Sequence, residues 1–249
     1  MHIGISPLKK IGCFIYSLIC YAAGVASMIY FILFVSDVWL VQTVNSVTQS
    51  VSFVSVVIVN VFALLLFGLQ HSIMARPSFK RWLVKVIDPS IERSTYILGT
   101  ALAIWAMCYL WIPFGDVIWH FETEIAVFMI RSVAIFGWLF LFLATFMINH
   151  FELFGLTQSY APMHGNTAPS VAFKISGFYK IVRHPIQTGV LIGIWAVPLA
   201  TTSHIVFATG ISIYIFVGLH FEEKDLIREF GDVYLNYMQQ VKRVIPFIL

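Results

Sequence analysis

The sequence predicts an all-α integral membrane protein of about six transmembrane helices, with a C-terminal helical hairpin and a cytosolic amphipathic helix. Of its 249 residues, 59% are hydrophobic and only 11% are charged, whereas a soluble domain has about 45–50% apolar and about 25% charged residues. Six spans of roughly 20 residues would occupy about half of the chain. No room is then left for a large soluble catalytic domain, and we expect one multi-pass membrane domain over residues 1–249.

The first four spans are expected near residues 11–35, 51–70, 96–112 and 125–148, because each run is apolar and is bounded by polar or charged residues. Basic residues precede the first run, as they do in a signal peptide. The run is longer than the usual stretch of about 7–15 residues, however, so an uncleaved anchor is favoured over a signal peptide.

The last apolar stretch, residues 186–220, is too long for one helix. A break within it is indicated by Pro198, Thr201, Thr202 and Ser203. We therefore predict a hairpin of two helices over residues 186–199 and 204–220. The chain then leaves the membrane and is expected to continue as a cytosolic amphipathic helix over residues 221–240.

Lysine and arginine alternate between the two sides of these spans, and this bias sets membrane orientation. Residues 36–50, residues 112–124 and the hairpin turn contain neither. The opposite side carries Lys9, Lys10, Arg76, Lys80, Arg81, Lys85, Arg93, Lys174, Lys180, Arg183, Lys224, Arg228, Lys242 and Arg243. Both termini are therefore expected in the cytoplasm, and Arg131, near the outer end of its span, is expected to snorkel.

Composition and spacing argue against several functions. The net charge is only +3 and the basic residues are scattered, so nucleic-acid binding is disfavoured. Cys13, Cys20 and Cys108 lie in apolar runs and lack the C-x-x-C spacing of zinc or redox sites, so we expect them to be packing residues. No G-x-G-x-x-G loop and no metal-ligand spacing occur, so neither a Rossmann site nor a metal is expected. A small transporter is disfavoured because no span has an acidic residue or a lysine near its middle.

Arg183, His184 and Pro185 immediately precede a predicted helix. Pro suits the first helical turn, and the unpaired N–H groups of a helix start, together with an arginine, favour a carboxylate or phosphate. Gly189 would let a neighbouring helix or a ligand approach closely. A juxtamembrane basic residue with a helix-packing glycine is the alternative.

Glu222 and Glu223 follow the last predicted span. Because the hairpin turn is short, we expect Arg183 and His184 to face these two carboxylates. Cations and carboxylates at a membrane boundary suit a zwitterionic ligand, and an ordinary interfacial salt bridge is the alternative.

The order of these motifs resembles that in the isoprenylcysteine carboxyl methyltransferase superfamily. The residues that carry the resemblance are Arg183-His184-Pro185, Gly189, Glu222-Glu223, Phe230-Gly231, Tyr234, Tyr237 and Pro246. Gln187 stands where relatives often have an aromatic residue or Met. Upstream segments that begin at His71, Glu92 and His150 are similar to the bacterial methanethiol S-methyltransferases of the nurim-like branch, and the likeness runs from about residue 60 to the end.

The resemblance implies S-adenosylmethionine as the methyl donor, a small thiol as the acceptor, dimethyl sulfide as the product of methanethiol, and a bacterial inner membrane as the location. The donor would be held by the membrane helices. Arg183 and His184 are expected to bind its carboxylate, and Glu222 or Glu223 its ammonium or ribose hydroxyls. The expected donor site also includes Pro185 and Gly189, with Tyr160, Tyr234 or Tyr237 covering the adenine.

An alkyl thiol is mostly protonated at neutral pH, since even cysteine has a pKa of about 8.5, so a base or a cationic environment is needed. The candidates for this catalytic role are His71, Arg76, His150 and Glu92, with His184 and Glu222 also able to act as bases. For His71, a hydrogen-bonding role at the end of a span is the alternative. Two other functions stay open: methylation of a prenylcysteine or lipid-like acceptor, and a non-catalytic, nurim-like membrane scaffold.

Overall fold

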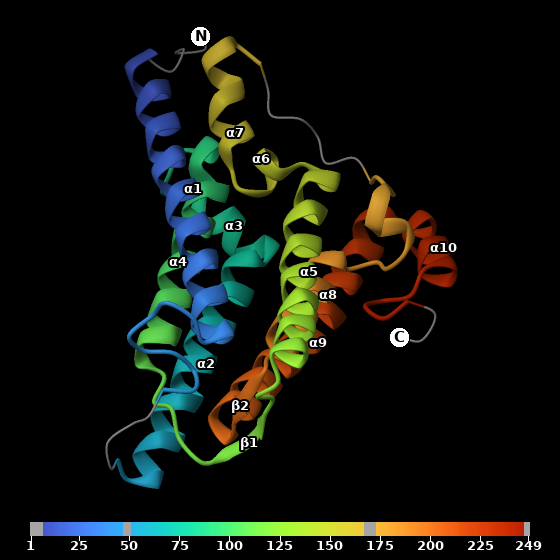
Figure 1. The fold of residues 1–249 in the computed structure, drawn as a ribbon. Coiled ribbons are helices and arrows are strands. Elements are labelled where there is room, and N and C mark those ends of the chain that lie inside the picture. Colours follow the sequence, from blue (N-terminus) through green and yellow to red (C-terminus); the bar gives the residue numbers. More distant parts are fainter. Residues whose placement is uncertain (1–6, 47–50, 167–172, 247–249) are drawn as a thin grey trace. The chain divides into compact units, whose positions relative to one another are not determined.

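The computed structural model describes residues 7–46, 51–166 and 173–246 (Figure 1). Contacts group the chain into two compact units. Unit 1 contains Met1–Phe31, Leu65–Tyr109 and Asn149–Ala172, and unit 2 contains Ile32–Leu64, Leu110–Ile148 and Phe173–Leu249. The described secondary structure is helical apart from two short strands, which confirms the predicted class. The single domain predicted over residues 1–249 stays a prediction.

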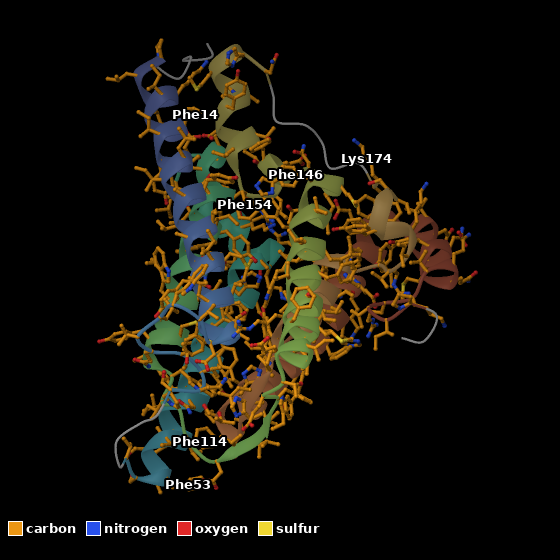
Figure 2. All side chains as sticks on the ribbon, viewed as in Figure 1. Phe14, Phe53, Phe114, Phe146, Phe154 and Lys174 are labelled. Carbon is orange, nitrogen blue, oxygen red and sulfur yellow. The ribbon has the colours of Figure 1, made fainter. Side chains whose placement is uncertain are left out.

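Within the described ranges, four helices are long and apolar enough to cross a membrane: α1 (Pro7–Ser36), α2 (Phe53–Ala75), α5 (Glu124–Ile148) and α9 (Thr202–Phe230). Large apolar side chains on these helices are exposed, among them Phe53 at 73% and Phe128 at 72%. Figure 2 shows carbon-rich side chains along the length of α1 and α2. Such surfaces suit lipid rather than water, so the chain is a helical membrane protein.

The other elements of unit 1 are short apart from one helix. They are α3 (Pro77–Leu83), η1 (Pro89–Ile91), α4 (Glu92–Leu110), α6 (His150–Leu153), α7 (Leu156–Tyr160) and η2 (Ala161–His164). Pro77 occupies the first turn of α3, and the Asp88 side chain accepts a hydrogen bond from Ser90 N–H at the start of η1. α4 corresponds to the span predicted at 96–112, but it is not one of the four helices that meet the length and apolarity of a span.

Buried hydroxyl groups join three segments of unit 1. Ser94 in α4 donates to Ser17 Oγ of α1 at 2.8 Å and contacts the carbonyl of Gly155 at 3.2 Å. Gly155 has φ +89°, and a Cβ there would lie 2.6 Å from Ser94 Oγ. A side chain at residue 155 would therefore separate the segment after α6 from α4.

Unit 2 contains α5 and α9, and adds β1 (Val117–His120), η3 (Gly177–Lys180), α8 (Pro185–Trp195), β2 (Leu199–Thr201) and α10 (Asp232–Gln240). α8 packs against α5 through small residues. A Cβ on Gly189 would lie 2.5 Å from the Gly137 carbonyl oxygen, and one on Gly193 would lie 2.3 Å from the Trp138 ring. The two helices are thus close enough for backbone contact.

The predicted hairpin differs from the structure in its connection. α8 ends at Trp195 rather than near 199, and the residues after it form strand β2, which pairs antiparallel with β1. α9 starts at Thr202 because Thr201 caps it, accepting a hydrogen bond from His204 N–H at 3.2 Å. With only 11 residues, α8 is about 16 Å long, which is half of the hydrocarbon thickness.

The predicted separate helix over 221–240 is corrected as well. α9 continues to Phe230, and α10 begins at Asp232. The sequence becomes polar after residue 220, but polarity alone does not end a helix. The break comes instead at Gly231, whose φ of +55° is available to glycine at little cost.

Amide side chains fasten the segments at the β1–β2 end of unit 2. Asn45, after α1, donates to the Leu199 carbonyl at 3.3 Å and accepts from Thr201 Oγ1 at 2.9 Å. Gln42 donates to the Trp111 carbonyl at 2.9 Å. The segments that follow α1, α4 and α8 therefore meet at one end of this unit.

Candidate functional site

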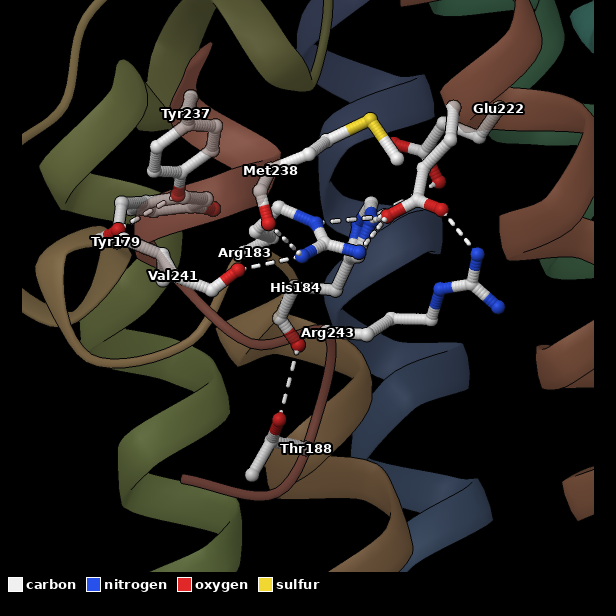
Figure 3. Close-up of polar contacts among 10 residues, drawn as sticks. Tyr179, Arg183, His184, Thr188, Glu222, Tyr237, Met238, Val241 and Arg243 are labelled. Atoms are coloured by element: carbon white, nitrogen blue, oxygen red, sulfur yellow. Dashed lines mark hydrogen bonds and ion pairs between the residues drawn. The ribbon is translucent and has the colours of Figure 1, made fainter. Parts of the chain in front are cut away.

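Glu223 of α9 is the centre of a buried charge cluster in unit 2 (Figure 3). Its Oε1 lies 2.7 Å from Arg183 Nη2 and 2.8 Å from Arg183 Nε, so two nitrogens of the guanidinium hold the same carboxylate oxygen. His184 Nε2 lies 3.1 Å from the same oxygen, and Arg243 Nη2 pairs with Oε2. The predicted approach of Arg183 and His184 to the carboxylates is therefore present, and α8 and α9 bring it about.

The chain returns after α10 to close this cluster. Arg183 N–H donates to the Lys242 carbonyl at 2.8 Å, and His184 N–H donates to the Arg243 carbonyl at 3.0 Å. Thr188 Oγ1 donates to the Val244 carbonyl at 2.8 Å. Residues 241–244 thus run across the start of α8, satisfy N–H groups there and place Arg243 beside Glu223.

Arg183, which was predicted to bind the donor carboxylate, is largely buried and has several internal partners. Only 9% of the residue is exposed, and its Nη1 donates to the carbonyls of Met238 and Val241 while its other nitrogens hold Glu223. A guanidinium with this many partners serves to join α8, α9 and residues 241–244. The predicted contact of Arg183 with a donor carboxylate stays a prediction.

Two charged side chains of the cluster are open to solvent. The Arg243 side chain is 30% exposed and the Glu222 side chain is 49% exposed, with Glu222 Oε2 at 4.0 Å from His184 Nδ1. One accessible cation and one accessible carboxylate match a ligand that carries both an anionic and a cationic group. The proximity predicted from the hairpin is thus correct, but the accessible arginine is a different one.

Two of the three tyrosines predicted to cover the adenine, Tyr234 and Tyr237, lie near this cluster and differ in their partners. Tyr237 donates to the Tyr179 carbonyl at 2.6 Å, and burial raises its pKa to about 12 against the opposing charge of Arg183. Tyr234 is buried, but its hydroxyl has no hydrogen-bond partner among the described residues. A buried, unpaired hydroxyl beside Glu223 and Arg183 is a candidate ligand contact.

Pro185 and Gly189 have packing roles in the structure. Pro185 is the first residue of α8, where its missing N–H costs nothing. Gly189 lies against the α5 backbone, as the helix-packing alternative expects, and its place in the donor site stays a prediction.

The predicted catalytic candidates and Tyr160 lie in unit 1. His71 Nδ1 is 3.1 Å from Thr100 Oγ1, and its ring stacks on Phe67. The Tyr96 hydroxyl lies 2.8 Å from His71 Nε2 and 3.1 Å from His71 Nδ1. His150 is 2% exposed, its Nε2 lies 3.0 Å from the Tyr21 hydroxyl, and burial lowers its pKa.

Three further predicted residues have local roles in this unit. Arg76 precedes α3 as its N-cap residue. Glu92 begins α4, and its Oε1 is buried without a hydrogen-bond partner among the described residues. Tyr160 is half exposed and packs against Phe14 and His164.

Sequence reasoning missed Arg243 as a member of the charge cluster, and it missed Tyr96 and Thr100 as partners of His71. Arg243 follows α10 in the chain, and no motif signals that residues 241–244 return to α8. For Tyr96 and Thr100 a signal was present, because residues four apart on a helix share a face.

The described residues contain no group of side chains suited to a metal ion. Two apolar grooves, of about 420 Å³ in unit 1 and about 450 Å³ in unit 2, are lined mainly by aromatic and aliphatic residues. None of the predicted site residues lines them, and their apolar lining suits lipid contact.

Helices of membrane length and a charge cluster at one end of a helix pair define a polytopic helical membrane protein. A methanethiol S-methyltransferase of Crocosphaera subtropica is 37% identical to the chain, over 98% of the chain and 95% of that protein. Methanethiol S-methyltransferase 1 of Bradyrhizobium diazoefficiens is 39% identical, over 97% of the chain and 85% of that protein. The chain therefore belongs to the methanethiol S-methyltransferase family and is a membrane methyltransferase.

Nurim of Bos taurus is 29% identical over 66% of the chain and 65% of that protein, which agrees with a nurim-like branch. No family model and no solved structure matches the chain.

Proposed function

We propose that the chain transfers a methyl group from S-adenosylmethionine to methanethiol and so produces dimethyl sulfide. Its similarity to proteins named methanethiol S-methyltransferase over nearly the full length of both chains carries this proposal. The reaction joins a thiolate to a methyl group bound to a sulfonium, so charge is lost in the transition state. A site with little water suits such a reaction.

The donor site is proposed at the charge cluster of unit 2. S-adenosylmethionine supplies a methyl group bound to a positively charged sulfur, together with a carboxylate, an ammonium and hydroxyl groups. Arg243 and His184 suit the carboxylate, and Glu222 suits the ammonium or a ribose hydroxyl. The unpaired hydroxyl of Tyr234 supports a polar contact there, while Arg183 and Glu223 hold these groups in place.

Activation of the thiol is proposed for unit 1. The imidazole of His71 contacts the hydroxyl groups of Thr100 and Tyr96, which supports a role for it in proton transfer. Glu92, His150 and Arg76 remain candidates that substitution can rank. The apolar residues of the spans would supply a dry environment for a small thiol.

We also propose six membrane crossings with both termini in the cytoplasm, in a bacterial inner membrane. The pairing of β1 with β2 supports this count, because it requires the chain to cross an even number of times between residues 120 and 199. α5 accounts for one crossing, so α8 with the extended residues after it would make the other. The hydrogen bond from Gln42 to the Trp111 carbonyl likewise places residues 42 and 111 on one side of the membrane. This supports one crossing by α2 and one by α4.

The test uses purified protein in detergent micelles, S-adenosylmethionine with a deuterated methyl group, and methanethiol. Deuterated dimethyl sulfide in the headspace is expected. If only a prenylcysteine is methylated, the lipid-like acceptor replaces the thiol. If no donor binds by calorimetry and no acceptor is methylated, a membrane scaffold is the better description.

A further inference from the structure

Residues 76–87, which lie between α2 and η1, form a basic segment. Its charged residues are all cations, namely Arg76, Lys80, Arg81 and Lys85. Arg81 and Lys85 are exposed, and neither has an acidic partner among the described residues. The next acidic residue, Asp88, is already paired, because its Oδ2 lies 2.9 Å from Lys9 Nζ. Arg81 and Lys85 therefore present positive charge at the surface of unit 1.

Large apolar side chains are exposed between these cations. Trp82 is 55% exposed and Val86 is 70% exposed. The Phe79 ring is the aromatic neighbour of Trp82, with the ring centroids 5.2 Å apart. Membrane orientation requires only the positive charge. It does not account for a tryptophan and a valine left exposed beside that charge, so the segment has the composition of an interaction surface.

Hydrogen bonds of the backbone fix the conformation of the basic segment. Leu83 is buried and anchors α3 in unit 1. After α3, Lys85 N–H donates to the Trp82 carbonyl at 3.0 Å, and Val86 N–H donates to the Leu83 carbonyl at 2.9 Å. The cations and the apolar side chains thus project from an ordered turn, so binding there requires little ordering of the chain.

The basic segment starts at the end of a membrane helix. With 23 residues, α2 is about 34 Å long, close to the hydrocarbon thickness of about 30 Å. Arg76 N–H donates to the Ile73 carbonyl at 3.1 Å, and α3 follows α2 with no linker between them. The residues just after α2 therefore lie at the level of the lipid headgroups.

A lipid-facing side of α2 extends to the same end. Leu65, Leu69 and Ile73 are spaced by four residues, so they share one face of the helix, and each is about half exposed. This apolar face ends within one turn of Arg76. The basic segment is thus continuous in the chain with a surface that suits acyl chains.

We propose that the basic segment binds a phospholipid with an acidic headgroup. Arg81 and Lys85 match its phosphate in charge, since a guanidinium fits two phosphate oxygens and an ammonium supplies a point charge. Trp82 and Val86 suit the boundary between headgroups and acyl chains, where tryptophan is enriched in membrane proteins. A soluble acidic peptide would match the charge, but the position at the end of a lipid-facing helix favours a lipid. The inference is independent of the proposed methyl transfer, because it involves neither donor nor acceptor.

The test follows Trp82 by fluorine NMR in the full chain labelled with fluorotryptophan, with its signal assigned from Trp82→Phe. Nanodiscs of phosphatidylcholine contain a small fraction of nitroxide-labelled lipid, either phosphatidylglycerol or phosphatidylcholine with the same acyl chains. Labelled phosphatidylglycerol should broaden the Trp82 signal several-fold more than labelled phosphatidylcholine. Trp39 is the internal control, since it is 93% exposed and residues 36–50 contain no lysine or arginine. Both lipids should broaden the Trp39 signal equally.

Removal of the two exposed cations should abolish this preference. In a variant with Arg81→Gln and Lys85→Gln, the affinity for phosphatidylglycerol relative to phosphatidylcholine should fall about fivefold for each charge removed. Lys224→Gln with Arg228→Gln is the matched control, because it removes the same charge from exposed positions of α9 that have acidic neighbours. The control variant should keep the preference of the parent protein.

Equal broadening of the Trp82 signal by the two lipids in the parent protein would overturn the proposal. So would a preference that survives the loss of Arg81 and Lys85, or one that the control variant loses to the same extent. Excess glycerol phosphate should leave the broadening unchanged, and displacement of the lipid by it would assign the site to free phosphate instead. A Trp82 signal that responds to a soluble polyglutamate peptide but not to phosphatidylglycerol would show a protein-docking surface and contradict lipid binding.

Discussion

Arg183 and Arg243 both pair with Glu223, yet their surroundings give them different roles. Arg183 is buried, and its nitrogens hold a carboxylate and two carbonyls, whereas Arg243 keeps part of its guanidinium exposed. An internal arginine contributes mainly to stability, because removing it leaves a buried carboxylate and carbonyls unpaired. An accessible arginine can contribute to binding instead.

Replacement of Arg243 tests this division. Arg243→Gln is expected to weaken the binding of S-adenosylmethionine about 10- to 100-fold, the cost of one hydrogen bond to a charged group. Isothermal titration calorimetry in detergent measures it. Arg228→Gln is the matched control, since the Arg228 side chain is 78% exposed and pairs with Asp225 at the surface. Equal donor affinity in the two variants would remove Arg243 from the donor site.

The charges of the site show what the sequence could and could not predict at this scale. The approach of Arg183 and His184 to Glu223 follows from a short connection between two apolar helices, so local information was sufficient. The approach of Arg243 depends on the chain returning after α10, which involves hydrogen bonds from backbone groups that every residue carries. No residue pattern distinguishes such a contact in advance.

Among the helices, α5 and α8 are in the closest contact. Gly189→Ala would place a methyl group 2.5 Å from the Gly137 carbonyl oxygen, a backbone atom that cannot rotate away. We expect a loss of about 1–3 kcal/mol from overpacking, seen as a lower midpoint of thermal unfolding in micelles. Gly218→Ala on α9 meets nothing within 4 Å and should instead be neutral or stabilising. A Gly189→Ala protein as stable as the parent would show that the two helices can separate freely.

Tyr237 in α10 is expected to make the stability of the folded protein depend on alkaline pH. Burial raises its pKa in the folded protein to about 12, whereas an unfolded tyrosine titrates near about 10. Its full contribution is therefore present below about pH 10 and is lost as the pH rises toward about 12, because the unfolded chain releases the proton first. The loss is on the order of 2 kcal/mol.

As the pH rises through this range, the free energy of unfolding in micelles should fall more steeply for the parent protein than for Tyr237→Phe. The pKa values of Tyr179 and Tyr234 are also raised by burial, so only the difference between parent and variant reports on Tyr237. Identical slopes would show that the Tyr237 hydroxyl does not titrate differently in the two states.

A helix boundary could be predicted from the sequence only where a specific residue type starts or ends a helix. The start of α8 at Pro185 has such a signal, and so does the break at Gly231. The end of α8 at Trp195 does not, because β2 exists only through its pairing with residues 117–120, which are distant in sequence. Apolar length alone therefore overestimated this helix.

At the scale of the whole molecule, the number of crossings can be tested by labelling from one side of the membrane. In a protein whose three cysteines are replaced by serine, Glu122→Cys should react with an impermeant maleimide in intact cells. Lys180→Cys should react only after lysis. If α4 and α8 did not cross, residue 122 would lie inside, so labelling of Glu122→Cys only after lysis would contradict six crossings.

The return of residues 241–244 to the start of α8 also bears on how the protein is made. Ribosomes add about 5–20 residues per second, and residues 241–244 are synthesised after the residues of α8 and α9. The contacts of Arg183 with the Val241 and Lys242 carbonyls, and of Glu223 with Arg243, can therefore form only after both helices have been made. A messenger truncated before codon 241 would yield a protein that lacks Arg243 and these two carbonyls, and we expect its charge cluster to stay open.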